Sequence, residues 1–439
     1  TGPDLSIALA QYGGCGVIPR SLLQEERVEA VKKVKRAKAG FVYDTINVQP
    51  DTPIAEVEKI RRETGYSSFP VVGDNGKLEG LLTEKRYRRD RDSVLPVSAR
   101  MKPVSEMKLG EDGISLGEAN DKLLEFGIGI LPILDKDGTY LCSVFWQDLQ
   151  KHLDYPDEFV DDKGRYRTFV AASMFPNDFD VVEQLVKEGA DGIVVDTADA
   201  KNPLMMDAIK RYLTLDVPVI GGNIIDREGF YLVARAGVHM AKIGQGPGYG
   251  CTTRRKKSQG RAQATAIRDC TAARDRFAKR KRGSYVNLCA DGGMEETGDM
   301  GVAFALGANC LMHGKYFCGM TESAAPIVTR TFRVDVPDNP SIQTIAVDFK
   351  WYWGEASAKG KNIDRYGHAD PKTFTTEGNE GPVPHVGSIH KVFPADIQTL
   401  KNTLFGSGAF DIQEFNEKAL LERQSVGSHA EGGSKVTRS

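Results

Sequence analysis

The sequence predicts an α/β protein that is built on a (β/α)8 TIM barrel and carries a repeated unit inserted into that barrel. Short apolar strands alternate with amphipathic helices in the second half of the chain, which indicates parallel strands with helices outside them. The rhythm changes between residues 44 and 155, which indicates the insert. A doubly wound sheet is the alternative architecture, but no GxGxxG motif follows its first strand.

The strands of the barrel can be placed in chain order. A helix at 5–13 and a strand at 15–18 open the chain, and another helix is expected at 21–38. Further strands are expected at 169–173, 193–196, 217–222, 239–243, 286–290 and 309–313. Helices are expected at 180–189, 204–213, 227–236, from 261 onward and at 299–306. Because this pattern supplies seven strands, we expect the first strand of an eight-stranded barrel before residue 1.

The insert contains two similar units about 60 residues apart, which is the sign of an internal repeat. The first includes SSFPVVGDNGKLEGLLTEK, in which a DNG turn joins two strands. The second has a helix at 116–126 followed by GIGILPILDKDGTYLCSVFWQDL. We therefore divide the chain into the N-terminal part of the barrel at 1–43, the insert at 44–155, and the remaining barrel with a flap and a C-terminal segment at 156–439.

The repeated pattern of the insert resembles tandem CBS modules. The resemblance implies a regulatory purine nucleotide, and a purely structural insert is the alternative. Such modules commonly hold ribose with the acid that closes a Thr-x-x-Asp motif. The first copy has Thr83 but Arg86 in the place of the acid, and the second has Asp148 but Phe145. The sequence therefore leaves nucleotide sensing open.

Composition disfavours several classes of protein. The formal net charge is −2, so no overall field draws the chain to nucleic acid or to a membrane, and no run of about 18 apolar residues is present to span a bilayer. The basic runs at 254–257 and 279–283 lack interleaved aromatic residues and are expected to be a solvated helix end and loop. Scattered cysteines without CxxC spacing favour a reducing compartment, the cytoplasm, over a disulfide or zinc framework.

Polar residues and glycines follow or end the predicted strands. They are Asp196, Asn223, Gly244, Asp291 and Gly314. In barrels of this kind catalysis takes place where strands pass into the loops that lead to the helices. Core packing does not explain these residue types at successive strand ends, and loop capping is the alternative for Asn223 and Asp291. We expect the active site at this edge.

The strongest motif is GQGPGYGCTTR, at residues 244–254. Its glycines allow the backbone to approach a ligand or an ion closely. Cys251 follows them in a loop rich in backbone amides, where a thiolate is stabilised and can act as a nucleophile. The other cysteines lie in predicted strands or helices and are expected to be small buried hydrophobes: Cys15, Cys142, Cys270, Cys289, Cys310 and Cys318.

The segment KIGQGPGYGCTTR resembles the active-site loop of the IMP dehydrogenase and GMP reductase family. Six further motifs match that family in order: GGN (221–223), CADGG (289–293), YWGE (352–355), DRYG (364–367), TTEG (375–378) and AEGG (430–433). The resemblance covers essentially the whole chain and is closest to the dehydrogenases.

The resemblance implies a covalent mechanism. Cys251 would attack C2 of the purine ring, hydride would leave to NAD, and Thr253 would help to position the water that hydrolyses the thioimidate. The cofactor would contact Asp196, Thr197, Asn223 and Gly244. The purine nucleotide would contact Asp291, Gly292, Gly293, Gly314, Lys315, Tyr249, Tyr352, Gly354 and Glu355. Its phosphate would lie on backbone amides near Gly293, Gly314 and Lys315, at helix N-termini.

The resemblance also implies how the two branches of the family differ. Dehydrogenases carry a long flap with an Arg-Tyr pair that activates water, and this chain has Arg365 and Tyr366 between Glu355 and Gly378. Glu377 offers a second proton route through Thr253. We therefore expect NAD-dependent oxidation of inosine 5'-monophosphate (IMP) to xanthosine 5'-monophosphate, in guanine nucleotide synthesis. An NADPH-dependent GMP reductase and a non-catalytic CBS nucleotide-sensing paralogue are the alternatives.

A monovalent cation and a homotetramer are implied as well. Members of the family bind potassium through loop carbonyls, here those of Gly246, Gly248 and Cys251. A neighbouring subunit would complete the site with Glu431, Gly432 and Gly433. Carbonyl oxygens on a glycine loop are ligands that hard cations prefer.

Two positions depart from the family's pattern. Tyr249 stands where the family usually has a serine that donates to phosphate, and a phenol can donate but needs more room. Asp196 is followed by Thr197 and Ala198, where the dehydrogenases usually have two serines, and this pair resembles the reductases more.

Overall fold

The chain forms two compact units. The computed structural model describes residues 1–37, 40–42, 45–146, 154–280, 285–336, 339–354, 357 and 378–425. One unit, here called the sheet unit, comprises Thr1–Ala8, Gly16–Val31 and Thr168–Ser439. The other, here called the insert unit, comprises Leu9–Cys15 and Lys32–Arg167.

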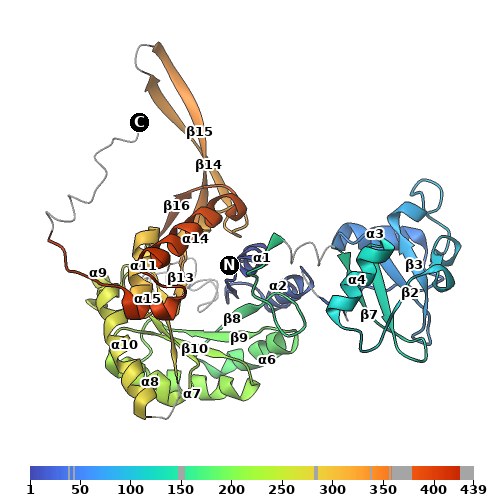
Figure 1. The fold of residues 1–439 in the computed structure, drawn as a ribbon. Helices are drawn as coiled ribbons and strands as arrows, with labels where there is room; N and C mark the ends of the chain where they lie inside the picture. The colour runs from blue at the N-terminus through green and yellow to red at the C-terminus, as the bar shows by residue number, and fades with distance from the viewer. Residues whose placement is uncertain are drawn as a thin grey trace. The chain divides into compact units, whose positions relative to one another are not determined.

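The sheet unit is organised around a curled sheet of seven parallel strands in the order β1-β8-β9-β10-β11-β12-β13 (Figure 1). The strands are β1 (Gly16–Ile18), β8 (Thr168–Ala172), β9 (Gly192–Asp196), β10 (Val219–Ile224), β11 (Met240–Ile243), β12 (Asn287–Asp291) and β13 (Cys310–Met312). Each lies within two residues of its predicted bounds. The curled sheet is a half-barrel that is consistent with a TIM-like barrel. Because β10 extends to Ile224, Asn223 lies inside a strand and not after it, which corrects the sequence prediction.

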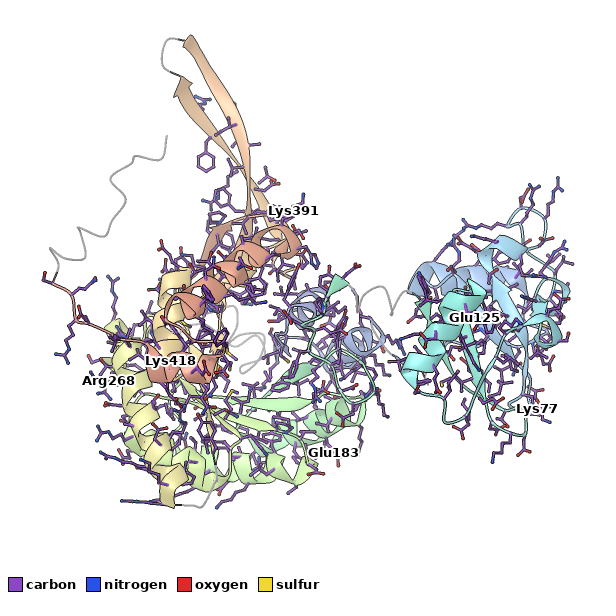
Figure 2. The ribbon with its side chains drawn as sticks, in the orientation of Figure 1. Lys77, Glu125, Glu183, Arg268, Lys391 and Lys418 are labelled. Atoms are coloured by element: carbon purple, nitrogen blue, oxygen red, sulfur yellow. The ribbon has the colours of Figure 1, made fainter. Side chains whose placement is uncertain are left out.

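Helices alternate with these strands as predicted. They are α1 (Pro3–Gln11), α2 (Gln24–Ala37), α6 (Phe179–Lys187), α7 (Pro203–Tyr212), α8 (Arg227–Ala236), α10 (Gln263–Arg280) and α11 (Thr297–Ala305). Local signals set their ends: the Asn202 side chain accepts a hydrogen bond from the backbone of Leu204 at the start of α7, and Gly237 ends α8 with a φ of 103°. Charged side chains on the outer helices point away from the sheet, as Figure 2 shows for Glu183 and Arg268.

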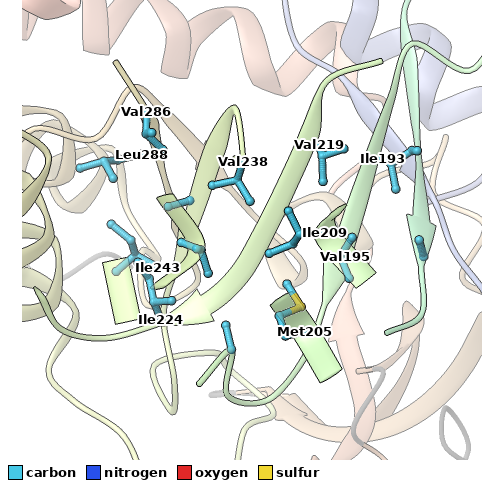
Figure 3. Packing of buried hydrophobic residues seen from close by; sticks show 14 of the residues in the cluster. Ile193, Val195, Met205, Ile209, Val219, Ile224, Val238, Ile243, Val286 and Leu288 are labelled. Atoms are coloured by element: carbon cyan, nitrogen blue, oxygen red, sulfur yellow. The ribbon is translucent and has the colours of Figure 1, made fainter. Parts of the chain in front are cut away.

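The core of the sheet unit lies between the strands and these helices. Met205 and Ile209 of α7 are fully buried and pack among strand residues (Figure 3). The strand side of this cluster includes Ile193, Val195, Val219, Ile224, Ile243 and Leu288. Truncating such a side chain to alanine costs about 2–5 kcal/mol, so this layer contributes strongly to the stability of the sheet unit.

A second, antiparallel sheet was not predicted. It contains β14 (Ile327–Val336), β15 (Asn339–Trp353) and β16 (Glu380–Pro384), paired in that order. Two helices that were also not predicted, α14 (Ile389–Gly406) and α15 (Ile412–Lys418), follow it. Two short helices, α9 (Thr253–Lys257) and α12 (Lys315–Cys318), lie in the loops after β11 and β13. Among the described helices none has the length and apolar character needed to span a membrane.

The insert unit contains two small sheets with separate cores. The first has α3 (Ile54–Thr64), β2 (Ser68–Val72), β3 (Leu78–Thr83) and β4 (Lys102–Pro103). The second has β5 (Gly110–Glu111), α4 (Leu116–Phe126), β6 (Ile130–Leu134) and β7 (Tyr140–Phe145). Each therefore combines a helix with an antiparallel strand pair, as the sequence repeat predicts.

Single 3-10 turns occur in both units. They are Glu84–Arg86, Val97–Ala99 and Val104–Glu106 in the insert unit, and Pro176–Asp178 and Leu213–Leu215 in the sheet unit.

Candidate active site

The structure brings the predicted strand-end residues to one edge of the parallel sheet. Asp196 and Asp291 are the last residues of β9 and β12, and Gly244 directly follows β11. Asn223 lies near the end of β10, and its side-chain amide donates to the Gly244 carbonyl and, over 2.9 Å, to Asp291 Oδ2. The residues are therefore joined to one another, so they do more than cap separate loops.

A lysine that sequence analysis missed lies at the centre of this edge. Lys242 of β11 is 3% exposed, and its Nζ lies 2.6 Å from Asp196 Oδ1 and 2.6 Å from Asp291 Oδ2. Burial alone would lower the pKa of Lys242, but the two carboxylates outweigh it and raise the pKa above its ordinary value. The ammonium ion therefore stays charged at neutral pH and fixes both carboxylates. A single lysine in the apolar strand HMAKI was the available signal.

Glycines allow two loops to approach closely at this edge. Gly244 has a φ of 147°, and a Cβ on it would lie 2.2 Å from the carbonyl oxygen of Asp291. Gly293 has a φ of 79°, and a Cβ there would lie 2.7 Å from the Pro247 side chain. The loops after β11 and β12 can pack together in this way because neither glycine has a side chain.

Cys251 lies in the loop between β11 and α9. Its thiol is half-buried and donates to Thr253 Oγ1 over 3.1 Å. The backbone of this loop pairs with the residues just before β16. Asn379 N donates to the Gly250 carbonyl over 2.7 Å, and Cys251 forms an isolated antiparallel β-bridge with Gly378. Thr253 is buried, so the hydroxyl beside the sulfur is held in place.

A cavity of about 390 Å³ adjoins this loop, which is within the usual range for small-molecule sites. Its lining includes the predicted nucleotide residues Tyr249, Asp291, Gly292, Gly293, Gly314, Lys315 and Tyr352. Sequence reasoning missed three other polar or aromatic lining residues, Glu295, His313 and Tyr316. The Tyr249 and Tyr352 rings meet edge to face at 6.0 Å between centroids.

Of the two glycines expected beside a phosphate, Gly314 directly precedes a helix, as predicted, whereas Gly293 lies in a loop, and the phosphate site itself stays a prediction. The helix after Gly314 is α12, which has only four residues. The helix after Gly293 does not begin until Thr297. A helix dipole acts within its first turn and requires a run of aligned peptides, so an anion in this cavity depends on individual amides and side chains.

Comparison with known proteins decides the family. A model of the IMP dehydrogenase / GMP reductase domain matches residues 1–435. The chain belongs to the IMP dehydrogenase / GMP reductase family. Inosine-5'-monophosphate dehydrogenase of Tritrichomonas foetus is 34% identical over 99% of this chain and 84% of the relative, and that of Aquifex aeolicus is 32% identical over 96% and 84%. The chain is therefore an oxidoreductase of this family.

Solved structures include the reductase branch of the family. A GMP reductase variant from Trypanosoma brucei, in complex with guanosine 5'-monophosphate, has a TM-score of 0.86 and 26% identity, and the match covers 100% of this chain and 88% of the reductase. The fold therefore does not separate the two branches, and their distinction depends on individual residues.

Several residues that the family resemblance singled out have other contacts or lie outside the described residues. Thr197 donates its hydroxyl to the Gly222 carbonyl over 3.1 Å. The Gly248 carbonyl, a predicted cation ligand, accepts from Cys251 N over 2.9 Å, and Gly246 has a φ of 88° in the same loop. Gly354 directly follows β15. The predictions for Glu355, Arg365, Tyr366, Glu377, Glu431, Gly432 and Gly433, and for Asp148 of the insert, fall outside the described residues.

The remaining cysteines are buried or half-buried, and the described residues of the basic runs are exposed. Four of the other cysteines are buried, at positions 142, 270, 289 and 318, whereas Cys15 and Cys310 are half-buried. The RRKK run forms the exposed part of α9, and Lys279 and Arg280 are exposed at the end of α10. Among the described side chains no cluster of three His, Cys, Asp or Glu residues is arranged to hold a metal ion.

Proposed function

We propose that this chain catalyses the NAD-dependent oxidation of IMP to xanthosine 5'-monophosphate through a covalent intermediate on Cys251. The observation that carries the proposal is the position of the Cys251 thiol, 3.1 Å from the Thr253 hydroxyl, in the loop whose preceding residues Pro247, Gly248 and Tyr249 line the cavity. A half-buried thiol beside a cavity of this size can reach the ring of a bound nucleotide.

The chemistry balances as two steps. The Cys251 sulfur forms a bond to C2 of the purine ring, and the hydrogen on C2 leaves with its electron pair. NAD, when bound, supplies the acceptor for that hydride. Water then adds at C2, the C2–sulfur bond breaks, and C2 becomes a carbonyl while the thiol is regenerated. The thiol loses its proton when the sulfur bonds to C2, and the two protons of water end on the sulfur and on the ring nitrogen next to C2. Thr253 Oγ1 accepts a hydrogen bond from the thiol, so it can relay the proton at the sulfur in both steps.

The residues near Lys242 fit a nicotinamide cofactor. Asn223 Oδ1 is buried and has no hydrogen-bond partner among the described residues, so it can accept from a carboxamide N–H. The Asp196 side chain is 39% exposed and keeps one oxygen for a ribose hydroxyl while the other binds Lys242. On the nucleotide side, Asp291 lines the cavity and would accept from the ribose of IMP. These roles for Asp196, Asn223 and Asp291 belong to the proposal.

The proposal includes a potassium ion and a homotetramer. The carbonyls of Gly246, Gly248 and Cys251 lie in one glycine loop, and oxygen ligands of this kind suit a monovalent cation. Glu431, Gly432 and Gly433 of a neighbouring subunit would complete the shell. Free cysteines throughout the described residues suit a reducing compartment, and we propose the cytoplasm.

We further propose that residues 44–155 are a CBS pair inserted into a (β/α)8 barrel, which would bind a regulatory purine nucleotide. A cavity of about 380 Å³ in the insert unit is lined by Glu58, Lys59, Arg62 and Arg89, among others. The Arg86 side chain donates to the Arg100 carbonyl over 3.0 Å. Arg86 is therefore directed to the backbone, so a nucleotide here would not use a Thr-x-x-Asp motif.

A cofactor assay tests the main proposal. Purified protein should reduce NAD with IMP, and potassium should increase the rate. GMP with NADPH should give no turnover. The reverse pattern would support a GMP reductase, the second candidate, which the Trypanosoma brucei reductase structure and the Thr197-Ala198 pair favour. A protein that binds nucleotide without either turnover would be a sensing paralogue.

Replacing Arg365 with alanine should separate the two chemical steps. Hydride leaves before water is needed, so the variant should give a normal first-turnover burst of NADH and then slow by on the order of 10²-fold. Rapid-mixing absorbance at 340 nm measures both phases. Arg333→Ala, on the exposed face of β14, is the control and should keep both phases. A variant with an unchanged steady-state rate would exclude Arg365 from water activation.

A further inference from the structure

Lys350 is a buried lysine of the second sheet that donates to three backbone carbonyl groups. It lies in the central strand β15 and is 3% exposed. Its Nζ lies 3.0 Å from the carbonyl oxygens of Ser323 and Ala325 and 3.3 Å from that of Thr321. These three oxygens, here called the carbonyl cage, belong to one turn between α12 and β14. An ammonium group has three protons, so each oxygen can accept one of them.

The acidic residue of this turn has other partners. The Glu322 carboxylate accepts from Ile389 N over 2.9 Å and from the Ser388 hydroxyl over 2.5 Å, at the start of α14. Among the described residues no carboxylate pairs with Lys350. A buried cation that has no opposite charge beside it depends on dipoles that point at it, and proteins bind monovalent cations with carbonyl groups in the same way. The carbonyl cage therefore resembles a monovalent cation site whose occupant is the ammonium group.

The turn needs a cation to keep its shape. Residues 321–325 form turns and bends and belong to no helix or strand. Carbonyl oxygens that converge on one point carry partial negative charges and repel one another unless a cation lies between them. Without the ammonium group of Lys350, the three oxygens should separate and the turn should open.

The carbonyl cage adjoins the wall of the nucleotide cavity. Met320 directly precedes the turn, Tyr352 lies two residues beyond Lys350 on β15, and both line the cavity. Val383, another lining residue, pairs with Lys350 across the sheet. Lys350 itself is not among the described lining residues. Any effect of this lysine on a bound nucleotide must therefore pass through its neighbours.

We propose that Lys350 is a positioning residue whose ammonium group acts as an internal monovalent cation. It closes the carbonyl cage and so fixes Met320 and Tyr352 in the wall of the nucleotide cavity. This inference rests on the proposed function, because it names a further residue on which nucleotide binding depends. Its loss should weaken nucleotide affinity and leave the chemistry at Cys251 nearly unchanged.

Replacing Lys350 with alanine or with methionine tests the inference. Both variants should raise the Kd for IMP about tenfold or more, the range for loss of a hydrogen bond to a charged group, and keep kcat within about threefold. Calorimetry measures the Kd, and NADH formation at saturating IMP and potassium measures kcat. Lys391→Ala removes an exposed lysine of α14 in the same unit (Figure 2) and is the control. It should bind IMP as the wild type does.

Chemical rescue separates the charge of Lys350 from its volume. Propylammonium has the atoms that Lys350→Ala removes, so it should restore the IMP affinity of this variant and raise its Tm in a saturable way. Propanol has a similar shape without the charge and should do neither. Lys350→Met already fills the space and should not respond to propylammonium, and neither should the wild type.

Three results would overturn the inference. Both variants could fold and bind IMP as tightly as the wild type, or propylammonium could rescue Lys350→Ala no better than propanol does. In either case the proposed function stands. If neither variant folds even with propylammonium present, the lysine is required for the fold itself, and its positioning role is wrong. A wild type that turns over neither IMP nor GMP would instead contradict the proposed function, and the Tm of Lys350→Ala would still test the carbonyl cage.

Discussion

Replacing Cys251 with alanine should abolish IMP oxidation and leave nucleotide binding nearly unchanged. The sulfur forms the bond that turns one difficult displacement into two easier steps, so its loss should lower kcat by on the order of 10⁴-fold or more. Binding should persist because the residues that line the cavity, among them Asp291 and Lys315, are untouched. NADH formation measures the first effect, and calorimetry with IMP measures the second.

Cys15→Ala is the matched control for that experiment. Cys15 is also half-buried, but it lies in the insert unit, where its Sγ is 3.8 Å from the Arg167 carbonyl oxygen. This variant should keep the wild-type rate. Should Cys251→Ala retain more than a few per cent of the wild-type rate, the covalent mechanism would have to be abandoned.

Replacing Lys242 with methionine should damage both stability and activity. Asp196 and Asp291 would lose the lysine that lies 2.6 Å from each of them. Breaking a fully buried ion pair costs about 3–5 kcal/mol, and the loss here should be smaller because the two carboxylates are 39% and 24% exposed and water can solvate them. Because Asp196 and Asp291 would no longer be fixed, kcat/KM should fall by on the order of 10²-fold or more. Chemical denaturation and initial rates measure the two losses.

A second substitution distinguishes electrostatics from packing. The double variant Lys242→Met with Asp196→Asn should recover part of the free energy of unfolding, because one unpaired charge is removed, but it should not recover activity. Folding raises the pKa of Lys242 above the ordinary lysine pKa of about 10.4. The charged lysine therefore makes its full contribution to the free energy of unfolding at any pH below that ordinary pKa. The contribution is lost only as the pH rises through the pKa of Lys242 in the folded protein. The stability deficit of Lys242→Met should therefore be constant between about pH 7 and 9. A variant with wild-type stability would show that the pair is not structural.

The parallel sheet could be predicted because burial leaves a strong record in the sequence. Strands such as β9 and β11 are almost wholly apolar, and the helices between them have one apolar face, as α8 does. Most strand ends could be predicted for the same reason, since the apolar run of a buried strand stops at Asp196 or just before Gly244. The family resemblance then gave the order of the motifs, which the comparisons support.

The second sheet was missed although its sequence contains a signal. Along β14, Val328, Arg330 and Phe332 alternate with Thr329 and Thr331, which is the period of a strand. Both faces mix polar and apolar residues, and Ile327 and Phe332 are exposed in the described sheet unit, so no apolar face pointed to a core. The hairpin of β14 and β15 is held by backbone hydrogen bonds, and backbone pairing leaves a weaker pattern in the sequence than an apolar face does.

The site geometry could not be predicted from spacing alone. Lys242 and Asp196 are 46 positions apart, and only the parallel register between β9, β10 and β11 brings them together. The contact of Lys315 with Tyr249 and Glu295 likewise joins three separate loops. Sequence motifs identified most of these residues one by one, but their mutual contacts depend on the closed packing of the loops.

The attachment of the segment before β16 to the Cys251 loop has an evolutionary consequence. Strand β15 ends at Trp353, next to Tyr352, whose ring meets that of Tyr249 edge to face. Where the described chain resumes, Gly378 and Asn379 pair with the Cys251 loop. The two described ends of this segment, at Tyr352 and at Gly378, therefore both lie beside the loop that carries Cys251. A change in the residues between these two ends need not alter the described contacts of Gly378 and Asn379 with the Cys251 loop. Part of the divergence between a hydrolysing and a reducing enzyme could then occur in one continuous stretch of gene.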